Sequence, residues 1–240
     1  MTRNVTKNRL NVTKNRQINC KCNSRLLQLH LHVIISAYKQ PRNTMLSERK
    51  QLVTIDNNIS KARWLLESVN SHKLLLTFIS KIINNTGKEE FEELEAGRLY
   101  TLNALDFSQF FELDKKHIFE VMKDIVDKLY EAEIILHPTD KKTIKFRWVS
   151  YIEYDGITKE IGLKWSPDVI PYISQLTGGF NTFPLAGVKK LHSVNSIRLY
   201  EIFSQFRNVK EKKVIYNVEE LKYILGLEGK YTGYAQINGA

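Results

Sequence analysis

The sequence LHSVNSIRLYEIFSQF, residues 191–206, decides the fold that this chain is expected to adopt. Its apolar residues recur on one face at helical spacing, so the segment from Ser193 to Phe206 is predicted to form a helix. Arg198 lies within that apolar stripe. If the stripe is buried, the guanidinium is expected to brace the fold through a carboxylate partner.

The segments before this helix alternate between helical and strand periodicity. Ser71 and Gly87 are expected to bound the first helix, and Asp114 is expected to cap the most amphipathic one. A further helix is expected to begin at Ser166, with Pro167 in its first turn. The predicted elements, in order, are a helix between 71 and 87, a strand over 98–103, helices over 105–113 and 114–130, strands over 133–138, 143–155 and 157–165, and a helix over 166–176.

This order of helix, strand, two helices and β-hairpins is typical of a winged helix, a helix-turn-helix followed by a β wing. After the helix at 193–206, a strand over 212–217 and a helix over 218–227 repeat the start of the pattern. The predicted fold class is therefore α+β, with tandem winged-helix domains of which the second is incomplete. The expected domains are a basic segment over 1–44, a first winged helix over 45–185 and a partial second winged helix over 186–240.

The net charge of +10 is concentrated at the N-terminal end of the chain. Residues 1–44 contain nine Lys and Arg and no acid, which leaves 27 basic and 26 acidic residues for 45–240. Local clusters, and not the bulk charge, therefore have to carry any argument for a nucleic-acid partner. The only cysteines are Cys20 and Cys22, which fits a reducing, cytoplasmic setting. No run of about 18 apolar residues is present, so no membrane span is expected, although a basic start before LLQLHLHVIISAY also fits a signal peptide.

Several stretches of the chain resemble one family of DNA-binding proteins. They are HKLLLTFISKI (72–82), DIVDKLYEAEI (124–134), RWVSYIEYD (147–155), SPDVIPYISQLTGGFNTFPL (166–185) and LHSVNSIRLYEIFSQF (191–206). Within the last stretch, SIRLYE (196–201) matches the family's signature helix almost letter for letter. On these residues the chain resembles the iteron-binding replication initiator proteins of theta-replicating plasmids, the RepB/RepE-like family.

The resemblance implies a sequence-specific DNA-binding initiator of plasmid replication that binds direct repeats, called iterons, at the origin. It also implies a homodimer through the first domain, which can repress its own gene, and contacts with the host's initiator and helicase machinery. Beyond Tyr231 it implies a basic helix where this chain has YAQINGA, so the second domain is expected to be incomplete. A winged-helix transcriptional repressor is the alternative that uses the same fold.

Clusters of basic residues mark where the chain is expected to contact DNA, because cations bind phosphates around the side chains that read base edges. Residues 186–216 contain seven Lys and Arg against two Glu, and the four cations of 139–147 face only Asp140. A wing tip with that charge can follow phosphates along a groove, although lysines on a helix face are more often only a solvated surface. The predicted DNA-binding residues are Lys115, Lys116, Lys123, Lys141, Lys142, Lys145, Lys189, Lys190, Arg198, Arg207, Lys210, Lys212 and Lys213.

Enzymatic activity has two weak signals in the N-terminal segment. On a strand, His30 and His32 would share one face, as the metal pair of a rolling-circle nicking protein requires, but no Tyr-x-x-x-Lys follows. Cys20 and Cys22 with these histidines fit no standard zinc-finger spacing. No phosphate-binding GxxxxGK[ST] loop is present either. The chain is therefore predicted not to be an enzyme, with no catalytic residue, metal site or cofactor.

The hexapeptide NVTKNR occupies residues 4–9 and again 11–16. Structural repeats use units of at least about 20 residues, and this unit has no apolar stripe. The offset of seven residues is 21 nucleotides, about two turns of duplex DNA. One hypothesis is that residues 4–17 are translated origin repeats, with the usual start at Met45. The alternative is a basic disordered arm that touches phosphates.

Overall fold

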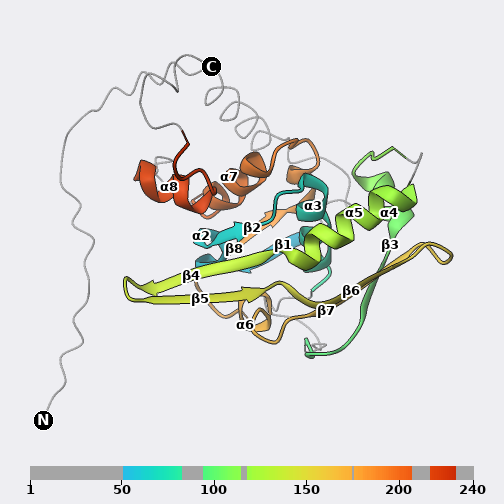
Figure 1. Cartoon of the computed structure of the whole chain (residues 1–240), viewed down its shortest axis with the longest axis horizontal. Helices are drawn as coiled ribbons and strands as arrows, with labels where there is room; N and C mark the ends of the chain where they lie inside the picture. The colour runs from blue at the N-terminus through green and yellow to red at the C-terminus, as the bar shows by residue number, and fades with distance from the viewer. Residues whose placement is uncertain (1–50, 83–93, 115–117, 175, 207–216, 231–240) are drawn as a thin grey trace, which may run out of the picture.

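The structure, a computed structural model, describes residues 51–82, 94–114, 118–174, 176–206 and 217–230. Within these ranges, helices and three small antiparallel sheets surround one apolar core (Figure 1), which confirms the α+β class. None of the helices in this part of the chain combines the length and the apolar character needed to cross a membrane.

A two-stranded sheet that the sequence did not predict joins the two ends of the first domain. Strand β1 (Leu52–Asp56) pairs antiparallel with β8 (Phe180–Pro184), and the hydroxyls of Thr54 and Thr182 lie 3.1 Å apart across the pair. Asp56 then caps the short helix α2 (Asn57–Lys61) by accepting a hydrogen bond from the backbone N–H of Asn58 at 2.7 Å. The partners of this sheet are far apart in sequence, so no local pattern indicates their pairing.

The other two sheets have three strands each. One has the order β2–β4–β5, and the other has the order β3–β7–β6. The strands are β2 (Arg63–Leu65), β3 (Tyr100–Asn103), β4 (Glu133–Thr139), β5 (Lys142–Arg147), β6 (Val149–Asp155) and β7 (Glu160–Trp165).

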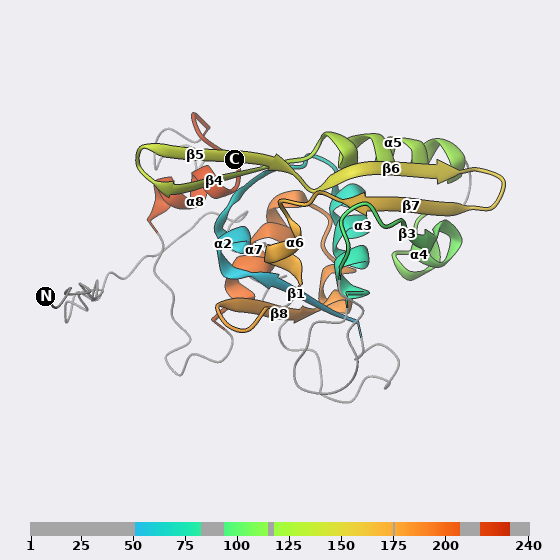
Figure 2. The same cartoon turned by 90° about the horizontal axis from the view of Figure 1, so that it is seen from below.

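The prediction of one continuous strand over 143–155 is wrong, because Trp148 divides it between the two sheets. The Trp148 side chain is fully buried, with its ring centroid 4.5 Å from that of Trp64 at an interplanar angle of 72°. Its carbonyl oxygen accepts a hydrogen bond from the backbone N–H of Ser166 at 3.1 Å. Burying this ring turns the chain inward, and the hairpins β4–β5 and β6–β7 therefore extend to opposite ends of the molecule (Figure 2).

The helices follow the expected order, but α3 and α6 begin at other residues than predicted. Helix α3 (Val69–Ser80) is capped by Ser68 and not by Ser71, whose hydroxyl instead donates to the Ile125 carbonyl at 2.9 Å. Helices α4 (Ala104–Phe110) and α5 (Ile118–Glu131) precede the β4–β5 wing as predicted. The expected cap at Asp114 leads into residues 115–117, outside the described ranges. Helix α6 (Ile170–Ile173) is shorter than predicted, because Ser166 continues from strand β7 and leaves Val169 at the N-cap.

Helix α7 (Val194–Ser204) begins after Ser193, as predicted, but it packs into the first core. Its Tyr200 ring meets the Phe183 ring edge to face, with 5.5 Å between centroids. The 3₁₀ turn η2 (Leu185–Val188) leads into it. Packing is therefore continuous across the expected boundary between 185 and 186. Helix α8 (Val218–Ile224) matches the predicted helix, whereas the expected strand over 212–217 falls almost wholly on residues outside the described ranges.

We expect Gly187→Ala to lower the free energy of unfolding by about 1–3 kcal/mol, the usual cost of overpacking a filled core. A Cβ at Gly187 lies 2.1 Å from the Tyr200 hydroxyl, and Tyr200 is only 4% exposed. Urea denaturation measures the change, and Gly178→Ala is the matched control because no atom lies within 4 Å of its Cβ position. Equal stability of the two variants would contradict the packing of α7 against η2.

Candidate nucleic-acid interface

The structure divides the thirteen predicted DNA-binding residues into five groups. One residue lies on helix α5, three lie on the β4–β5 hairpin, and two directly follow the 3₁₀ turn η2. Arg198 lies in the core. The remaining predicted residues lie outside the described ranges and are Lys115, Lys116, Arg207, Lys210, Lys212 and Lys213.

The β4–β5 hairpin brings together the densest set of cations among the described residues. Lys141 and Lys142 lie at its turn, and Lys145 lies along β5 together with Arg147, which is not among the thirteen predicted residues. All four side chains are exposed, and none has an ion-pair partner among the described residues. The Arg147 guanidinium lies 5.3 Å from the ring centroid of Tyr130, an exposed aromatic near the end of α5.

Strand register places Lys145 and Arg147 on one side of the β2–β4–β5 sheet, which we call the wing face. Lys145 pairs with Ile135, which pairs with Arg63, so these three residues form one row. Residues directly opposite one another in antiparallel strands project from the same face. Arg147 lies in the next row. We define the wing face by Arg63, His137, Lys145 and Arg147.

Helix α5 presents an acidic surface, which weakens the prediction for Lys123. The described part of its exposed side carries twice as many acids as lysines. One of those lysines, Lys128, is already paired with Asp124 at 2.9 Å. A surface with an excess of carboxylates repels phosphates. The exposed charged residues are Glu120, Lys123, Asp124, Asp127, Lys128 and Glu131.

The two lysines after η2 differ in their surroundings. Lys189 Nζ lies 2.8 Å from the Glu112 carboxylate and 5.7 Å from the ring centroid of Phe110. The hydrogen bond from Lys189 lowers the pKa of the Glu112 carboxyl, so this carboxylate is ionised at neutral pH. Lys189 is thus held by an acid, whereas Lys190 is exposed.

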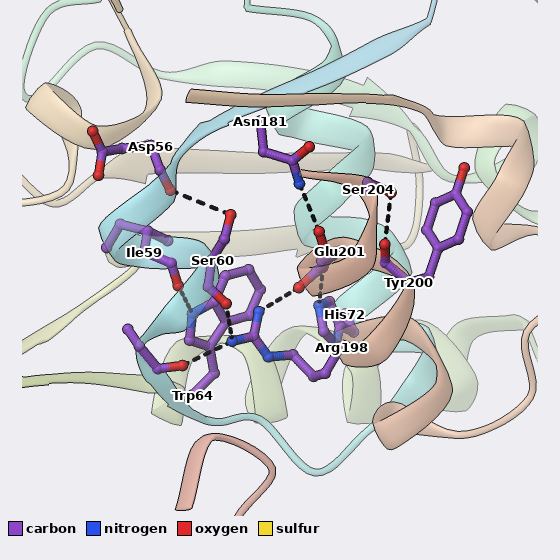
Figure 3. A network of polar contacts seen from close by, with 11 residues as sticks. Asp56, Ile59, Ser60, Trp64, His72, Asn181, Arg198, Tyr200, Glu201 and Ser204 are labelled. Carbon is purple, nitrogen blue, oxygen red and sulfur yellow. Dashed lines mark hydrogen bonds and ion pairs between the residues drawn. The ribbon is translucent and has the colours of Figure 1, made fainter. Parts of the chain in front are cut away.

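Arg198 occupies the centre of a buried polar cluster (Figure 3) and does not reach the surface. It is 2% exposed, and its guanidinium pairs with the fully buried carboxylate of Glu201. Its Nη2 atom donates to the backbone carbonyls of Ser60 and Ala62 at 2.9 and 2.7 Å, and its Cζ lies 3.9 Å from the Trp64 ring centroid. The geometry supports the bracing role and excludes a DNA contact in this conformation.

The carboxylate of Glu201 extends the cluster to two further elements. Its second oxygen accepts a hydrogen bond from His72 Nε2 of α3 at 2.8 Å, which places a proton on that nitrogen. The Glu201 backbone carbonyl accepts a hydrogen bond from Asn181 Nδ2 of β8 at 2.7 Å. The cluster therefore joins α2, α3, α7 and β8, and it has a structural role.

Metal chemistry has no support in this part of the chain. The described residues contain no group of three or more His, Cys, Asp or Glu side chains that could hold a metal ion. The pairs Cys20 with Cys22 and His30 with His32 lie outside the described ranges.

We expect Glu201→Gln to lower the free energy of unfolding by about 3–5 kcal/mol, because it leaves a buried guanidinium without its counter-charge. The measurement is urea denaturation. Glu219→Gln is the control, since Glu219 forms the same i,i+3 type of pair with Lys222 but its side chain is 78% exposed. A change below about 1 kcal/mol for Glu201→Gln, the range of exposed pairs, would show that Arg198 is not braced by this carboxylate.

Comparison with known proteins identifies a solved structure that shares this fold. The solved structure of the Pi initiator protein in complex with iteron DNA is 20% identical and has a TM-score of 0.61, over 78% of this chain and 81% of that one. The WH1 domain of MSBI1.176, a replication protein isolated from a multiple sclerosis patient, is 23% identical over 45% of this chain and 79% of that one, with a TM-score of 0.33. An uncharacterized 27.6 kDa protein of Escherichia coli is 20% identical over 167 residues, 68% of this chain and 70% of that protein.

A family profile described as Initiator Replication protein, WH1, matches residues 52–204. The match starts at the first residue of β1 and ends at the last residue of α7, the two elements that close the first core. The profile spans more than half of the chain. This chain therefore belongs to the initiator replication protein family, with residues 52–204 as the part that matches its WH1 domain.

Proposed function

We propose that this chain initiates plasmid replication by binding directly repeated DNA at the origin, with the β4–β5 wing in contact with the phosphates. The observation that carries the wing contact is the set of four cations without acidic partners, among the described residues, on one projecting hairpin. The Pi initiator protein, which shares this fold, was solved in complex with iteron DNA. The family supports the role in initiation.

The spacing of the cations suits a phosphate backbone. Residues two apart on an antiparallel strand lie about 6.8 Å apart on the same face. Neighbouring phosphates of one DNA strand rise about 3.4 Å along the duplex axis and, because the backbone also winds around that axis, lie roughly twice that distance apart. Lys145 and Arg147 thus fit two phosphates of one strand, and Lys141 lies further along the same hairpin, in its turn.

The same surface serves the alternative of a transcriptional repressor, since binding to its own gene can block transcription. The proposal includes no catalytic step, because phosphate contacts and base contacts suffice to position an initiator on DNA. We also propose that the protein acts in the cytoplasm. Its further partners are a second copy of the chain through the first domain and the host's initiator and helicase machinery.

We expect Lys145→Gln with Arg147→Gln to weaken duplex binding and to reduce the slope of log K against log salt by about 0.9 for each phosphate that is no longer bound. A fluorescence-anisotropy titration over several salt concentrations measures both. Lys123→Gln with Lys128→Gln is the control, because it removes the same charge from the acidic side of α5. Equal weakening by the two double variants would show that only net charge matters.

The repeated hexapeptide near the N-terminus suggests what the DNA ligand is. Residues 4–10 and 11–17 differ only at Leu10 and Gln17. The codons CTN and CAR for these residues can differ at the middle base alone, so the two 21-bp units can be identical at all other positions. Units of about two helical turns present the same face of the duplex to successive copies of a protein. We propose that codons 4–17 contain two binding sites for this chain.

We expect the full chain to shift a duplex of codons 4–17 specifically in the presence of excess competitor DNA. A duplex that encodes the same residues with synonymous codons is the control, because a protein that reads base edges binds less tightly when the bases change. Third positions that match between the two units would agree with this expectation. Equal binding of the native and recoded duplexes would show that residues 1–44 act only as a basic arm.

A further inference from the structure

Helix α8 lies beside the β4–β5 hairpin and covers part of the wing face (Figures 1 and 2). The Tyr223 hydroxyl forms a hydrogen bond with His137 Nε2 of β4, and the centroids of the two rings lie 5.4 Å apart. His137 Nδ1 is in turn 3.1 Å from the Thr143 hydroxyl of β5. The helix that follows the first domain is therefore attached to the same surface that carries the wing cations.

The turn after α8 brings a carboxylate onto a cation of the wing face. Gly226 and Gly229 both have positive φ, at 66° and 74°, a conformation that favours glycine. The Leu227 backbone N–H donates to the Lys222 carbonyl at 2.8 Å, which ends the helix in a tight turn. Glu228 lies between the two glycines, and its carboxylate pairs with the Arg63 guanidinium. Arg63 also lies 5.5 Å from the Tyr223 ring centroid.

Arg63 belongs to the same row of the sheet as Lys145, with Ile135 between them. Adjacent strands are about 4.8 Å apart, so the Cα atoms of Arg63 and Lys145, which have one strand between them, lie about 10 Å apart across the face. A carboxylate on a guanidinium occupies the donors that a phosphate oxygen would use, since both anions accept the same fork of N–H groups. We propose that Arg63 is a further phosphate-binding residue of the wing face, masked by Glu228 when α8 is docked.

The contact is weak enough for DNA to displace it. The side chains of Arg63 and Glu228 are 26% and 40% exposed, and ion pairs at such exposure contribute about 0–1 kcal/mol. Ile224 is the one residue of α8 that is buried. Contacts between domains of one chain commonly resemble transient interfaces. Docking of α8 and phosphate binding at Arg63 are thus mutually exclusive, so the position of α8 depends on DNA at the wing.

A double-mutant cycle on the full chain tests this inference, which rests on the proposed wing contact with DNA. The variants are Glu228→Gln, Arg63→Gln and both together, with Glu219→Gln as the control for removal of an acid from the preceding helix α8. The probe is a duplex of unrelated sequence about three helical turns long, because phosphate contacts do not depend on sequence. Anisotropy titrations at several salt concentrations give affinity and salt slope.

We expect Glu228→Gln to bind about two- to fivefold more tightly than the unchanged chain, the fold-change that corresponds to an exposed ion pair. Its salt slope should steepen by about 0.9, the value for one additional bound phosphate. In the Arg63→Gln background the same substitution should change neither quantity. Tighter binding that persists without Arg63, or that Glu219→Gln reproduces, overturns the inference. If Glu228→Gln leaves the affinity unchanged, the masking of Arg63 is overturned. If Lys145→Gln with Arg147→Gln also leaves the affinity unchanged, the proposed wing contact itself fails.

Discussion

The buried ion pair between Arg198 and Glu201 is the constraint on which the first domain depends. Two charges removed from water carry a large desolvation cost, which is offset only where their hydrogen-bonding groups have partners. Here the guanidinium is bonded to Glu201 and to two carbonyls of the α2 region, and the carboxylate is bonded to Arg198 and to His72. The cluster can form only when α2, α3 and α7 are all in place. The end of the domain is thereby fixed to its beginning.

The charged groups of this protein fall into two sets with different roles, one buried in the core and one exposed on the surface. The ionic groups at the centre hold helices together and are closed to solvent. The densest set of exposed cations among the described residues lies on the β4–β5 hairpin. The helix-turn-helix of α4 and α5 lies beside the β6–β7 hairpin, away from the β4–β5 tip (Figure 2), and the described part of α5 exposes mainly carboxylates. Among the described residues, the wing and not the helix-turn-helix therefore carries the excess of positive charge.

The sequence predicts what depends on local periodicity. The helix that begins after Ser193 and the order of α4, α5 and the wing follow from apolar spacing and capping residues. Long-range pairing leaves no such pattern, so β1 with β8 was not predicted. The alternation of apolar and polar residues in 143–155 is the same on both sides of Trp148. It therefore does not show that the two halves of this segment join different sheets. Charge alone also does not show that Lys189 is paired or that Arg63 shares a row with Lys145.

The division of one chain segment at Trp148 has a consequence for how this protein can change over evolutionary time. The two hairpins extend in opposite directions from a buried corner, and their turns lie outside the apolar core of the described residues (Figure 2). Insertions, deletions and reversals of charge at either tip therefore alter one surface and leave the other unchanged. The corner itself has no such freedom, because the Trp148 ring fills space against Trp64. Relatives can therefore vary the length and charge of one hairpin independently of the other, provided that a large aromatic side chain remains at this position.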